Sequence, residues 1–327
     1  MMRLAGTGAR SVVLLLAALA VNAPGRPAAA NNAPEPPKLK SATVEAFDRY
    51  VRLTDARNDT ELEHGTSLLR ADDLAEPQRT EAHAELKSGQ VWIQRLQTRD
   101  AGATIHCPDG MIHHWVGVVF VPGAKVQDVL AVLEDYDRHA VYYAPDVERS
   151  KIESREGDHF RVFLRFRRHK VITVVLNTEH DVRYFRDSDT RAHSRSSAVR
   201  IAEVENPGKS DEREKTPGED DGFLWRMETW WRMIEGDGGV YVQSEVASLT
   251  RDIPTGLGWL LAPFVTSVPK ESLTFTLQAT RKAVEKRFSK ASLRRITPSV
   301  ASDPNPTAAR PETYGALTTY NASGAMP

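Results

Sequence analysis

The chain has 327 residues, with 43 basic and 44 acidic side chains and a formal net charge of −1. A domain that binds nucleic acid carries a broad basic surface, and this balance of charge argues against that class. Hydrophobic residues make up 40% of the sequence, which is enough to give a domain of about 200 residues a sizeable apolar core.

Residues 1–30 have the pattern of a secretory signal, with Arg3 and Arg10 ahead of an apolar stretch at 11–21. Cleavage is expected after Ala28-Ala29-Ala30, or alternatively near residues 21–23. An uncleaved anchor is the other interpretation, but the apolar stretch is too short to cross a bilayer. We therefore expect an exported protein, periplasmic or secreted, with a mature charge of about −4 because three arginines leave with the signal.

Cys107 is the only cysteine, so no disulfide can form within the chain. An exported protein without disulfides relies on its hydrophobic core for stability. This cysteine usage is compatible with a bacterial cell envelope.

Residues 31–110 are expected to form an N-terminal extension that is partly helical and partly linker. Residues 31–40 are rich in Pro and Ala, as in flexible linkers. Residues 44–53 have helical spacing, 56–89 are charged and weakly patterned, and 91–96 indicate a strand.

The regular part of the chain begins near residue 111. Residues 115–121 are an apolar, β-branched run that ends at Pro122-Gly123, which predicts a strand. Residues 125–136 predict an amphipathic helix. Its apolar face comprises Val126, Val129, Leu130, Leu133 and Tyr136.

Period-two alternation in the following segments predicts a meandering antiparallel sheet. The expected strands are 147–156, 160–167, 171–184, 195–204, 223–234 and 240–249. Residues 205–221 interrupt them with Pro, Gly and charge, and predict a long exposed loop. Residues 235–239 contain three glycines and predict a hairpin turn.

The last predicted element is a long helix, with Ser267 as its cap and Pro269 in its first turn. Its apolar stripe comprises Leu273, Leu277, Val284 and Phe288. The tail, 289–327, has a composition typical of disorder.

An apolar loop, Ile253–Phe264, leads into this helix. Loops are usually polar, because their backbone groups need water. The loop is therefore expected to be a gate over an apolar cavity. The alternative is that Leu257, Trp259, Leu260 and Phe264 plug the end of a solid core.

The order strand, helix, many antiparallel strands, long helix predicts an α+β fold over residues 111–288. In this arrangement the long C-terminal helix covers the concave face of a curved antiparallel sheet. The space between sheet and helix is a natural place for a ligand cavity.

The aromatic strand 223–234 is predicted to line that cavity. Its odd-numbered positions are apolar and include methionines, which adapt to irregular ligands. They are Phe223, Trp225, Met227, Thr229, Trp231 and Met233. Ordinary core packing would use the same residues and stays open as an alternative.

Charged residues on the opposite parity are expected to form solvated faces. They are Arg226, Glu228 and Arg232, and in an earlier strand Arg161, Arg165 and Arg167. A register slip through a bulge would turn one of these charges inward, where an arginine would anchor a carboxylate or phosphate.

Direct signs of catalysis and of metal binding are weak in the sequence. His113 and His114 are adjacent on a strand and point to opposite faces, so a metal cluster with His106, Cys107 and Asp109 is not expected. Asp135, Asp137, His139, Tyr142 and Tyr143 follow the first helix. They form either a polar loop or a group for acid–base chemistry at a cavity mouth.

The chain resembles the START-like superfamily, which includes polyketide cyclases (SRPBCC proteins), over Ile112–Phe288. The resemblance lies in the element order, in the segments 121–137 and 142–146, and in the closing helix 269–288. It implies a helix-grip fold with a deep hydrophobic cavity that binds lipids or other apolar molecules. The 205–221 loop and the N-terminal extension depart from the minimal pattern.

We therefore expect an exported, non-enzymatic binding or transfer module for a hydrophobic small molecule or lipid. Neither cofactor, metal nor nucleic acid is expected, and the loop 253–264 is expected to contact membranes transiently. A cyclase or aromatase using Tyr142, Tyr143 or His139 is the alternative, and a solid structural module is a third. The expected ligand-binding residues are Trp225, Met227, Trp231, Met233, Leu257, Trp259, Phe264, Leu273, Leu277, Tyr142 and Tyr143.

Overall fold

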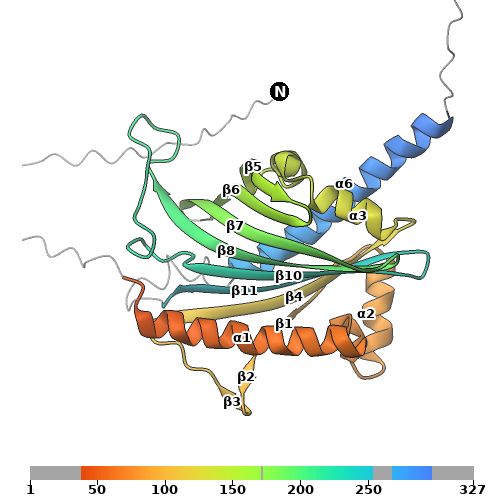
Figure 1. Cartoon of the computed structure of the whole chain (residues 1–327), viewed down its shortest axis with the longest axis horizontal. Coiled ribbons are helices and arrows are strands. Elements are labelled where there is room, and N and C mark those ends of the chain that lie inside the picture. Colours follow the sequence, from red (N-terminus) through yellow and green to blue (C-terminus); the bar gives the residue numbers. More distant parts are fainter. Residues whose placement is uncertain (1–37, 171, 253–266, 297–327) are drawn as a thin grey trace, which may run out of the picture. The chain divides into compact units, whose positions relative to one another are not determined.

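A computed structural model describes residues 38–170, 172–252 and 267–296, with residues 288–296 as backbone alone. The predicted loop Ile253–Phe264 and the predicted signal at 1–30 lie outside these ranges. Within them the chain forms a large antiparallel sheet and a long C-terminal helix (Figure 1). The predicted α+β helix-grip class is confirmed.

The helices have the following bounds. They are α1 (Ser41–His64), α2 (Gln78–Lys87), α3 (Val126–Leu133), α4 (His139–Tyr142) and α6 (Val268–Ile296), with the 3-10 turns η1 (Arg70–Asp73) and η2 (Tyr136–Arg138). The predicted face of α3 is buried as expected. Its N-terminus is capped by Asp128, whose carboxylate accepts a bond from the backbone N–H of Lys125 at 2.9 Å.

The strands run antiparallel in the order β1-β4-β11-β10-β8-β7-β6-β5, and β9 pairs with β8. They are β1 (Trp92–Arg95), β4 (Gly110–Pro122), β5 (Val147–Glu156), β6 (His159–His169), β7 (Thr173–Ser188), β8 (Arg191–Glu205), β9 (Arg213–Glu214), β10 (Arg226–Gly236) and β11 (Gly239–Arg251). A separate hairpin joins β2 (Arg99–Asp100) and β3 (Ala103–Thr104).

The turn between β10 and β11 has the predicted hairpin geometry. Gly236 pairs with Gly239, and the two residues between them, Asp237 and Gly238, both have positive φ. Asp and Gly are the residue types that accept this left-handed backbone. The turn fixes the register of β10 against β11, and with it which side chains of β10 face each side of the sheet.

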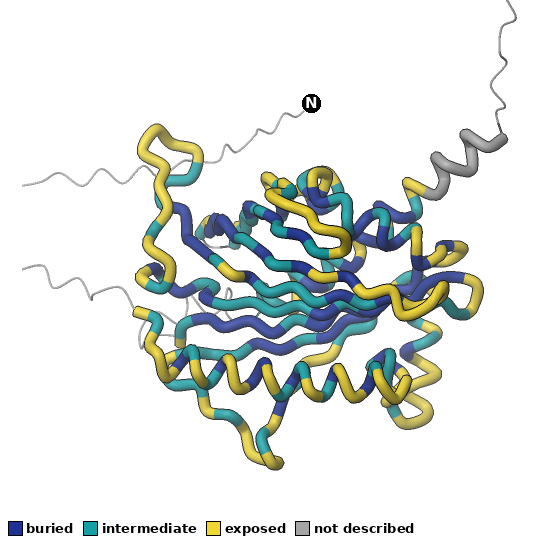
Figure 2. Tube along the Cα trace, viewed as in Figure 1, coloured by how far each residue is buried: buried dark blue, intermediate teal, exposed yellow. Residues whose placement is uncertain are grey.

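Helices cover both sides of the sheet (Figure 1). We call the side that carries Met227, Thr229, Trp231 and Met233 of β10 the α6 face. The main apolar core lies there, where Leu273, Leu277 and Val284 of α6 are buried as predicted. Figure 2 shows the buried positions following the strands beneath the helices. Phe288 lies among the residues described as backbone alone.

The opposite side, which we call the α1 face, carries Trp230 and Arg232. The helix α1 packs on it through Phe47 and Tyr50, which form an apolar cluster with Trp225 and Trp230. Residues 38–110, expected as an extension, thus contribute α1 to this cluster and β1 to the sheet.

The expectation that Arg226, Glu228 and Arg232 form a solvated face is wrong, because α1 covers this side. Arg232 is only 3% exposed. It donates hydrogen bonds to Glu61 Oε2 at 2.7 Å and to the carbonyl of Ser67 at 2.9 Å. A buried guanidinium needs such partners, since an unpaired buried charge is costly.

A second buried charge on the α1 face is Glu245 of β11, which is 1% exposed. It accepts a hydrogen bond from His114 Nε2 at 2.7 Å and forms an ion pair with Arg57. Burial opposes its charge, but the bond from His114 and the charge of Arg57 outweigh that effect and lower the pKa of Glu245 to about 2. The charges of Arg232 and Glu245 on this face are therefore each paired with an opposite charge.

The arginines of β6 are also less solvated than expected. Arg165 is 4% exposed, because the 205–221 segment folds back and places Glu212 on it. Two bonds, at 2.9 and 3.0 Å, join the guanidinium to this carboxylate. The predicted loop covers the sheet here, and no register slip is needed to bury the arginine.

Candidate ligand-binding cavity

A cavity of about 300 Å³ lies between the α6 face of the sheet and the first turns of α6. Its walls come from β4, β6, β7, β8, β10, β11 and α6, and from residues 133–147. Strand alternation explains the lining, because every second residue of each strand points to the same side.

Four predicted ligand-binding residues line this cavity: Met227, Trp231, Leu273 and Tyr143. Met227 and Trp231 come from the predicted apolar parity of β10, and Leu273 from the predicted stripe of α6. The sheet and the helix thus bring together residues that are far apart in the sequence.

Three other predicted residues pack next to the cavity without lining it. Met233 and Leu277 are fully buried in the main core, where α3 and α6 meet the sheet. Tyr142 packs against the same core, and its hydroxyl donates to Asp135 Oδ2 at 2.7 Å. At Met233 ordinary core packing, the alternative stated for this strand, describes the structure.

Trp225 was predicted on the cavity side and lies instead on the α1 face. Its ring joins the cluster of Phe47 and Tyr50, and its indole N–H donates to Asp220 at 2.9 Å. The strand β10 begins at Arg226, so the alternation that placed Trp225 does not extend to it. The predicted residues Leu257, Trp259 and Phe264 lie outside the described ranges.

The apolar wall of the cavity was only partly predicted. Its wall on β6 and β7 consists of Leu164, Phe166, Val174, Leu176 and Val182. The alternation in these strands was recognised from the sequence, but which of the two parities faces the ligand was assigned only for β10.

At one end of the cavity, which we call the tyrosine end, the polar groups bond to one another. Tyr136 and Tyr184 share a hydroxyl–hydroxyl bond of 2.7 Å, and Tyr184 also donates to the carbonyl of Leu133. The hydroxyl of Tyr143 bonds to Thr280 at 3.0 Å, and burial raises the pKa of Tyr143 to about 12. Burial lowers the pKa of His139 to about 4. This end is uncharged at neutral pH.

His180 lines the cavity wall and was not predicted there. Burial lowers its pKa to about 4, so the ring is neutral. Thr178 Oγ1 donates to the carbonyl of Leu164, so it accepts from His180 Nε2 at 2.8 Å. The unprotonated nitrogen is then Nδ1, which lies 3.4 Å from the hydroxyl of Ser196.

A charged pair, Arg168 and Asp146, also belongs to the lining. Arg168 donates to Asp146 Oδ1 at 2.8 Å and to the hydroxyl of Ser272 of α6 at 2.7 Å. Arg168 was not predicted to line the cavity, because the arginines considered in this strand were those at odd-numbered positions. Arg168 shares the parity of Leu164 and Phe166, and that signal would have placed it in the cavity.

The two adjacent histidines take opposite faces, as predicted. His114 lies on the α1 face between Tyr50 and Glu245, and His113 bonds to Thr250 at 3.0 Å. In the described ranges no three His, Cys, Asp or Glu side chains are grouped so as to hold a metal ion.

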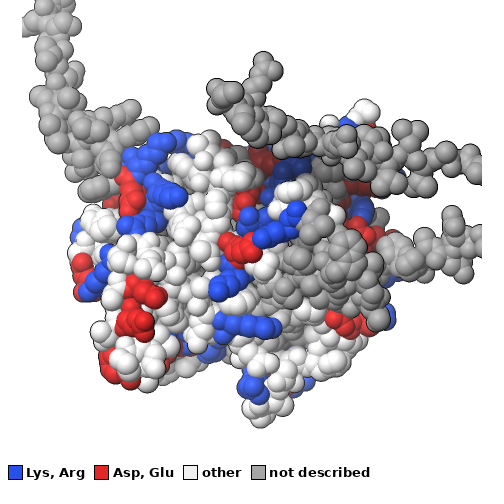
Figure 3. All heavy atoms as spheres, turned by 180° about the vertical axis from the view of Figure 1, so that it is seen from behind, with Lys and Arg blue, Asp and Glu red and all other residues white. Residues whose placement is uncertain are grey.

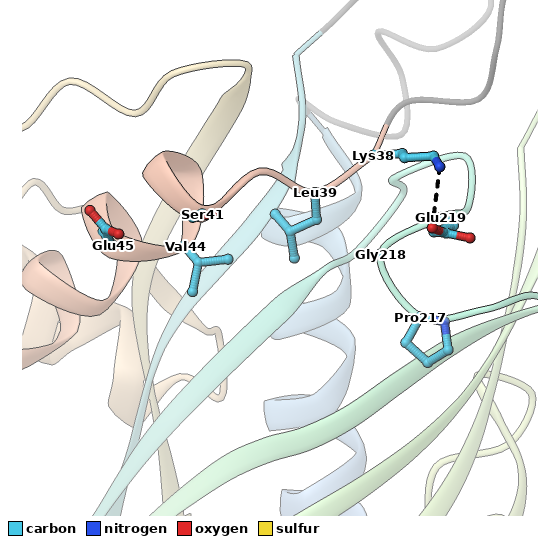
Figure 4. Close-up of a pocket in the computed structure, with 8 residues that line it drawn as sticks. All are labelled: Lys38, Leu39, Ser41, Val44, Glu45, Pro217, Gly218 and Glu219. Atoms are coloured by element: carbon cyan, nitrogen blue, oxygen red, sulfur yellow. Dashed lines mark ion pairs between the residues drawn. The ribbon is translucent and has the colours of Figure 1, made fainter.

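A second hollow lies beside residues 38–45 (Figure 4). It is an open groove between this segment and residues 217–219, crossed by an ion pair of 3.4 Å from Lys38 to Glu219. Most of its lining is exposed, so it offers a ligand much less burial than the cavity does.

The surface around α6 carries both signs of charge. On the side opposite to that of Figure 1, acidic groups lie among the basic ones (Figure 3). Ion pairs join Lys170 to Glu271 and Arg155 to Glu134. Of the helices that the structure describes, none combines the length and apolarity that a membrane crossing requires.

No protein-family model and no curated protein matches this sequence. Among solved structures, a STAR-related lipid transfer protein from Xanthomonas axonopodis is 18% identical with a TM-score of 0.39, covering 58% of this chain and 98% of that one. The Zhui aromatase/cyclase from Streptomyces sp. R1128 is 16% identical with a TM-score of 0.37, covering 55% and 98%. Human STARD10 is 9% identical with a TM-score of 0.39, covering 68% and 85%.

At these identities the likeness concerns the fold alone. The chain is similar in fold to a STAR-related lipid transfer protein and to an aromatase/cyclase.

Proposed function

We propose that this protein is an exported binding or transfer module that holds one hydrophobic ligand between the sheet and α6. The observation that carries the proposal is the cavity of about 300 Å³ with a largely apolar wall. Ligand sites are typically clefts of about 300–1,000 Å³ that enclose most of the ligand surface. A volume at the lower end of that range favours a single compact molecule.

Burial of apolar surface supplies the affinity. Each 100 Å² of apolar ligand area removed from water contributes about 2.5 kcal/mol. The side chains of Leu164, Phe166 and Leu176 offer such a surface. The groups at the tyrosine end are neutral and already hydrogen-bonded, so they need no polar partner from the ligand.

The experiment is titration of the purified protein with a fluorescent fatty acid, cis-parinaric acid, and with a fluorescent sterol. We expect saturable binding of at least one probe. Thr229→Phe places a ring in the cavity, since Thr229 lines it, and should weaken probe binding at least tenfold. Thr104→Phe, on the exposed β3, is the matched control and should bind as the wild type does.

Absence of binding for both probes would contradict the proposal, as would equal binding by Thr229→Phe and the control. The exported setting is a separate part of the proposal and rests on the signal-like pattern of residues 1–30. Mass spectrometry of the intact secreted or periplasmic protein tests it, with loss of about thirty N-terminal residues expected.

A cyclase-type enzyme is the second candidate, and the neutral His180 in the cavity wall favours it. Its Nδ1 carries no proton and accepts from the hydroxyl of Ser196, so the two side chains together can take up a proton from a bound substrate. Tyr142, Tyr143 and His139, the residues predicted for this role, instead bond to Asp135, Thr280 and the carbonyl of Val132. Chromatography with mass detection of a ligand recovered after prolonged incubation separates the two functions. Recovery of the ligand with unchanged retention time and mass supports binding, and a new product that His180→Gln abolishes supports the enzyme.

A further inference from the structure

Three strands bring two serines to either side of Trp231. In the register of β10, Trp231 lies opposite Ser194 of β8 on one side and opposite Ser244 of β11 on the other. Residues directly opposite one another on neighbouring strands point to the same face. All three side chains accordingly line the cavity.

Both serine hydroxyls are buried and have no hydrogen-bond partner within the described residues. Ser194 is 2% exposed and Ser244 is 1% exposed. Leaving a buried hydroxyl unpaired costs about 1–3 kcal/mol. Two such groups on one row of a sheet, both facing an open space, indicate that the space supplies their partner.

The hydroxyls at the tyrosine end of the same cavity, in contrast, do have hydrogen-bond partners. There Tyr136, Tyr184 and Tyr143 all bond to protein groups. Within the part of the chain that the structure describes, the buried hydroxyls without a partner are therefore confined to the strip formed by β8, β10 and β11.

The chemistry of this strip is neutral. A serine hydroxyl donates one bond and accepts others, so it pairs with hydroxyl and carbonyl oxygens alike. The charged pair of the cavity, Arg168 and Asp146, belongs to β6 and the segment before β5 and is satisfied internally. No charged side chain lies in the row of Ser194, Trp231 and Ser244.

Strand spacing sets the distance between the two serines. Neighbouring strands lie about 4.8 Å apart, so residues two strands apart are separated by about 10 Å. The side chain of Trp231 belongs to the residue between them in this row.

We propose that Ser194 and Ser244 form a polar subsite for a ring-containing apolar ligand with two neutral oxygens, hydroxyl or carbonyl, about 10 Å apart across Trp231. This inference rests on the proposed function, because it specifies the ligand of the same cavity. It selects oxygenated ring compounds over plain hydrocarbons and over ligands recognised through a charged head.

The test compares two rigid probes by calorimetric titration: biphenyl and its 4,4′-diol, whose oxygens are separated by about the required distance. We expect the wild type to bind the diol at least tenfold more tightly than biphenyl. Ser194→Ala and Ser244→Ala should each weaken diol binding about three- to tenfold and leave biphenyl binding unchanged, since a hydrogen bond is worth about 0.5–1.5 kcal/mol.

Ser197→Ala is the matched control, because Ser197 is on β8 but bonds to Glu228 on the α1 face. It should bind both probes as the wild type does. Equal binding of diol and biphenyl, or diol binding unaffected by both serine variants, would overturn the subsite while the proposed function stands. Failure of both probes to bind would count against the cavity as a ligand site and would overturn the subsite with it.

Discussion

The two faces of the central sheet are both covered by a helix, yet they are filled in opposite ways. Under α1 an aromatic cluster packs beside fully buried charges, and Arg232 and Glu245 find partners in Glu61, His114 and Arg57. Under α6 the wall is largely apolar, a cavity of about 300 Å³ remains with the pair Arg168–Asp146 in its lining, and the hydroxyls of Ser194 and Ser244 are left unpaired.

The difference separates a structural interface from a binding site. A buried charge is tolerated only where partners are fixed in place, which requires a filled interface. A buried hydroxyl without a partner costs less free energy than a buried unpaired charge, so it can stay unpaired until a ligand binds. Changes on the α1 face should therefore affect folding, and changes around the cavity should affect binding.

The largest expected effect comes from breaking the α1 face at Arg232. Arg232→Met removes one counter-charge of Glu61 and leaves the carbonyl of Ser67 without this donor. We expect a loss of about 3–5 kcal/mol in the free energy of unfolding, measured by urea denaturation. Arg226→Met, on the same strand and face, is the control and should cost less than about 1 kcal/mol. Similar losses in the free energy of unfolding for the two variants would contradict the stabilising role of the Arg232 hydrogen bonds.

The second effect is a dependence of stability on pH at Glu228 of the same face. Burial raises the pKa of Glu228 from 4.5 to about 7. Between these values the folded state keeps a proton that the unfolded state loses, so stability falls as pH rises from about 4.5 to 7 and then levels off. The total loss is roughly 3 kcal/mol.

Glu228→Gln lacks this titration. Urea denaturation of both proteins at pH 5 and pH 8 checks this difference, and the wild type should lose about 2.5 kcal/mol relative to the variant. Parallel behaviour of the two proteins would mean that Glu228 is not titrating in this window.

A smaller effect is expected where α6 meets the sheet at Gly117. A Cβ at this position would lie 2.6 Å from Leu277 Cδ1, which is fully buried and cannot move aside freely. Gly117→Ala should cost about 1–3 kcal/mol by overpacking and should weaken probe binding, because Leu273 of the same helix lines the cavity. Adding Leu277→Val should restore much of both losses in thermal denaturation and titration. A variant as stable as the wild type would contradict this close packing.

The smallest effect is expected at the tyrosine end. Tyr136→Phe removes the bond to Tyr184, but Tyr184 keeps its bond to the carbonyl of Leu133. The cost should be about 0.5–1.5 kcal/mol in urea denaturation, with probe binding unchanged. A large loss of binding would place the ligand's polar group at this end and not beside Trp231.

Periodicity was sufficient to predict the fold and part of the cavity. Alternation located the strands of the sheet, and helical spacing identified the buried stripe Leu273, Leu277 and Val284. Met227 and Trp231 followed from the apolar parity of β10. These features depend on residues close together in sequence, where the pattern itself holds the information.

Features that depend on distant partners could not be read from the pattern. Arg232 looked solvated because Glu61, its partner, lies 171 positions away. Trp225 was misplaced because the strand begins one residue after it. Ser194 and Ser244 carry no signal as single residues, and become a pair only through the register with Trp231.

Native mass spectrometry of the protein, purified without detergent from cells that make its ligand, tests the central claim most directly. The account predicts a complex with one small hydrophobic molecule, lost in Thr229→Phe and kept in Thr104→Phe and Glu228→Gln. A wild-type protein that carries no molecule and takes up none of the probes, or one that retains its molecule in Thr229→Phe, would contradict the account.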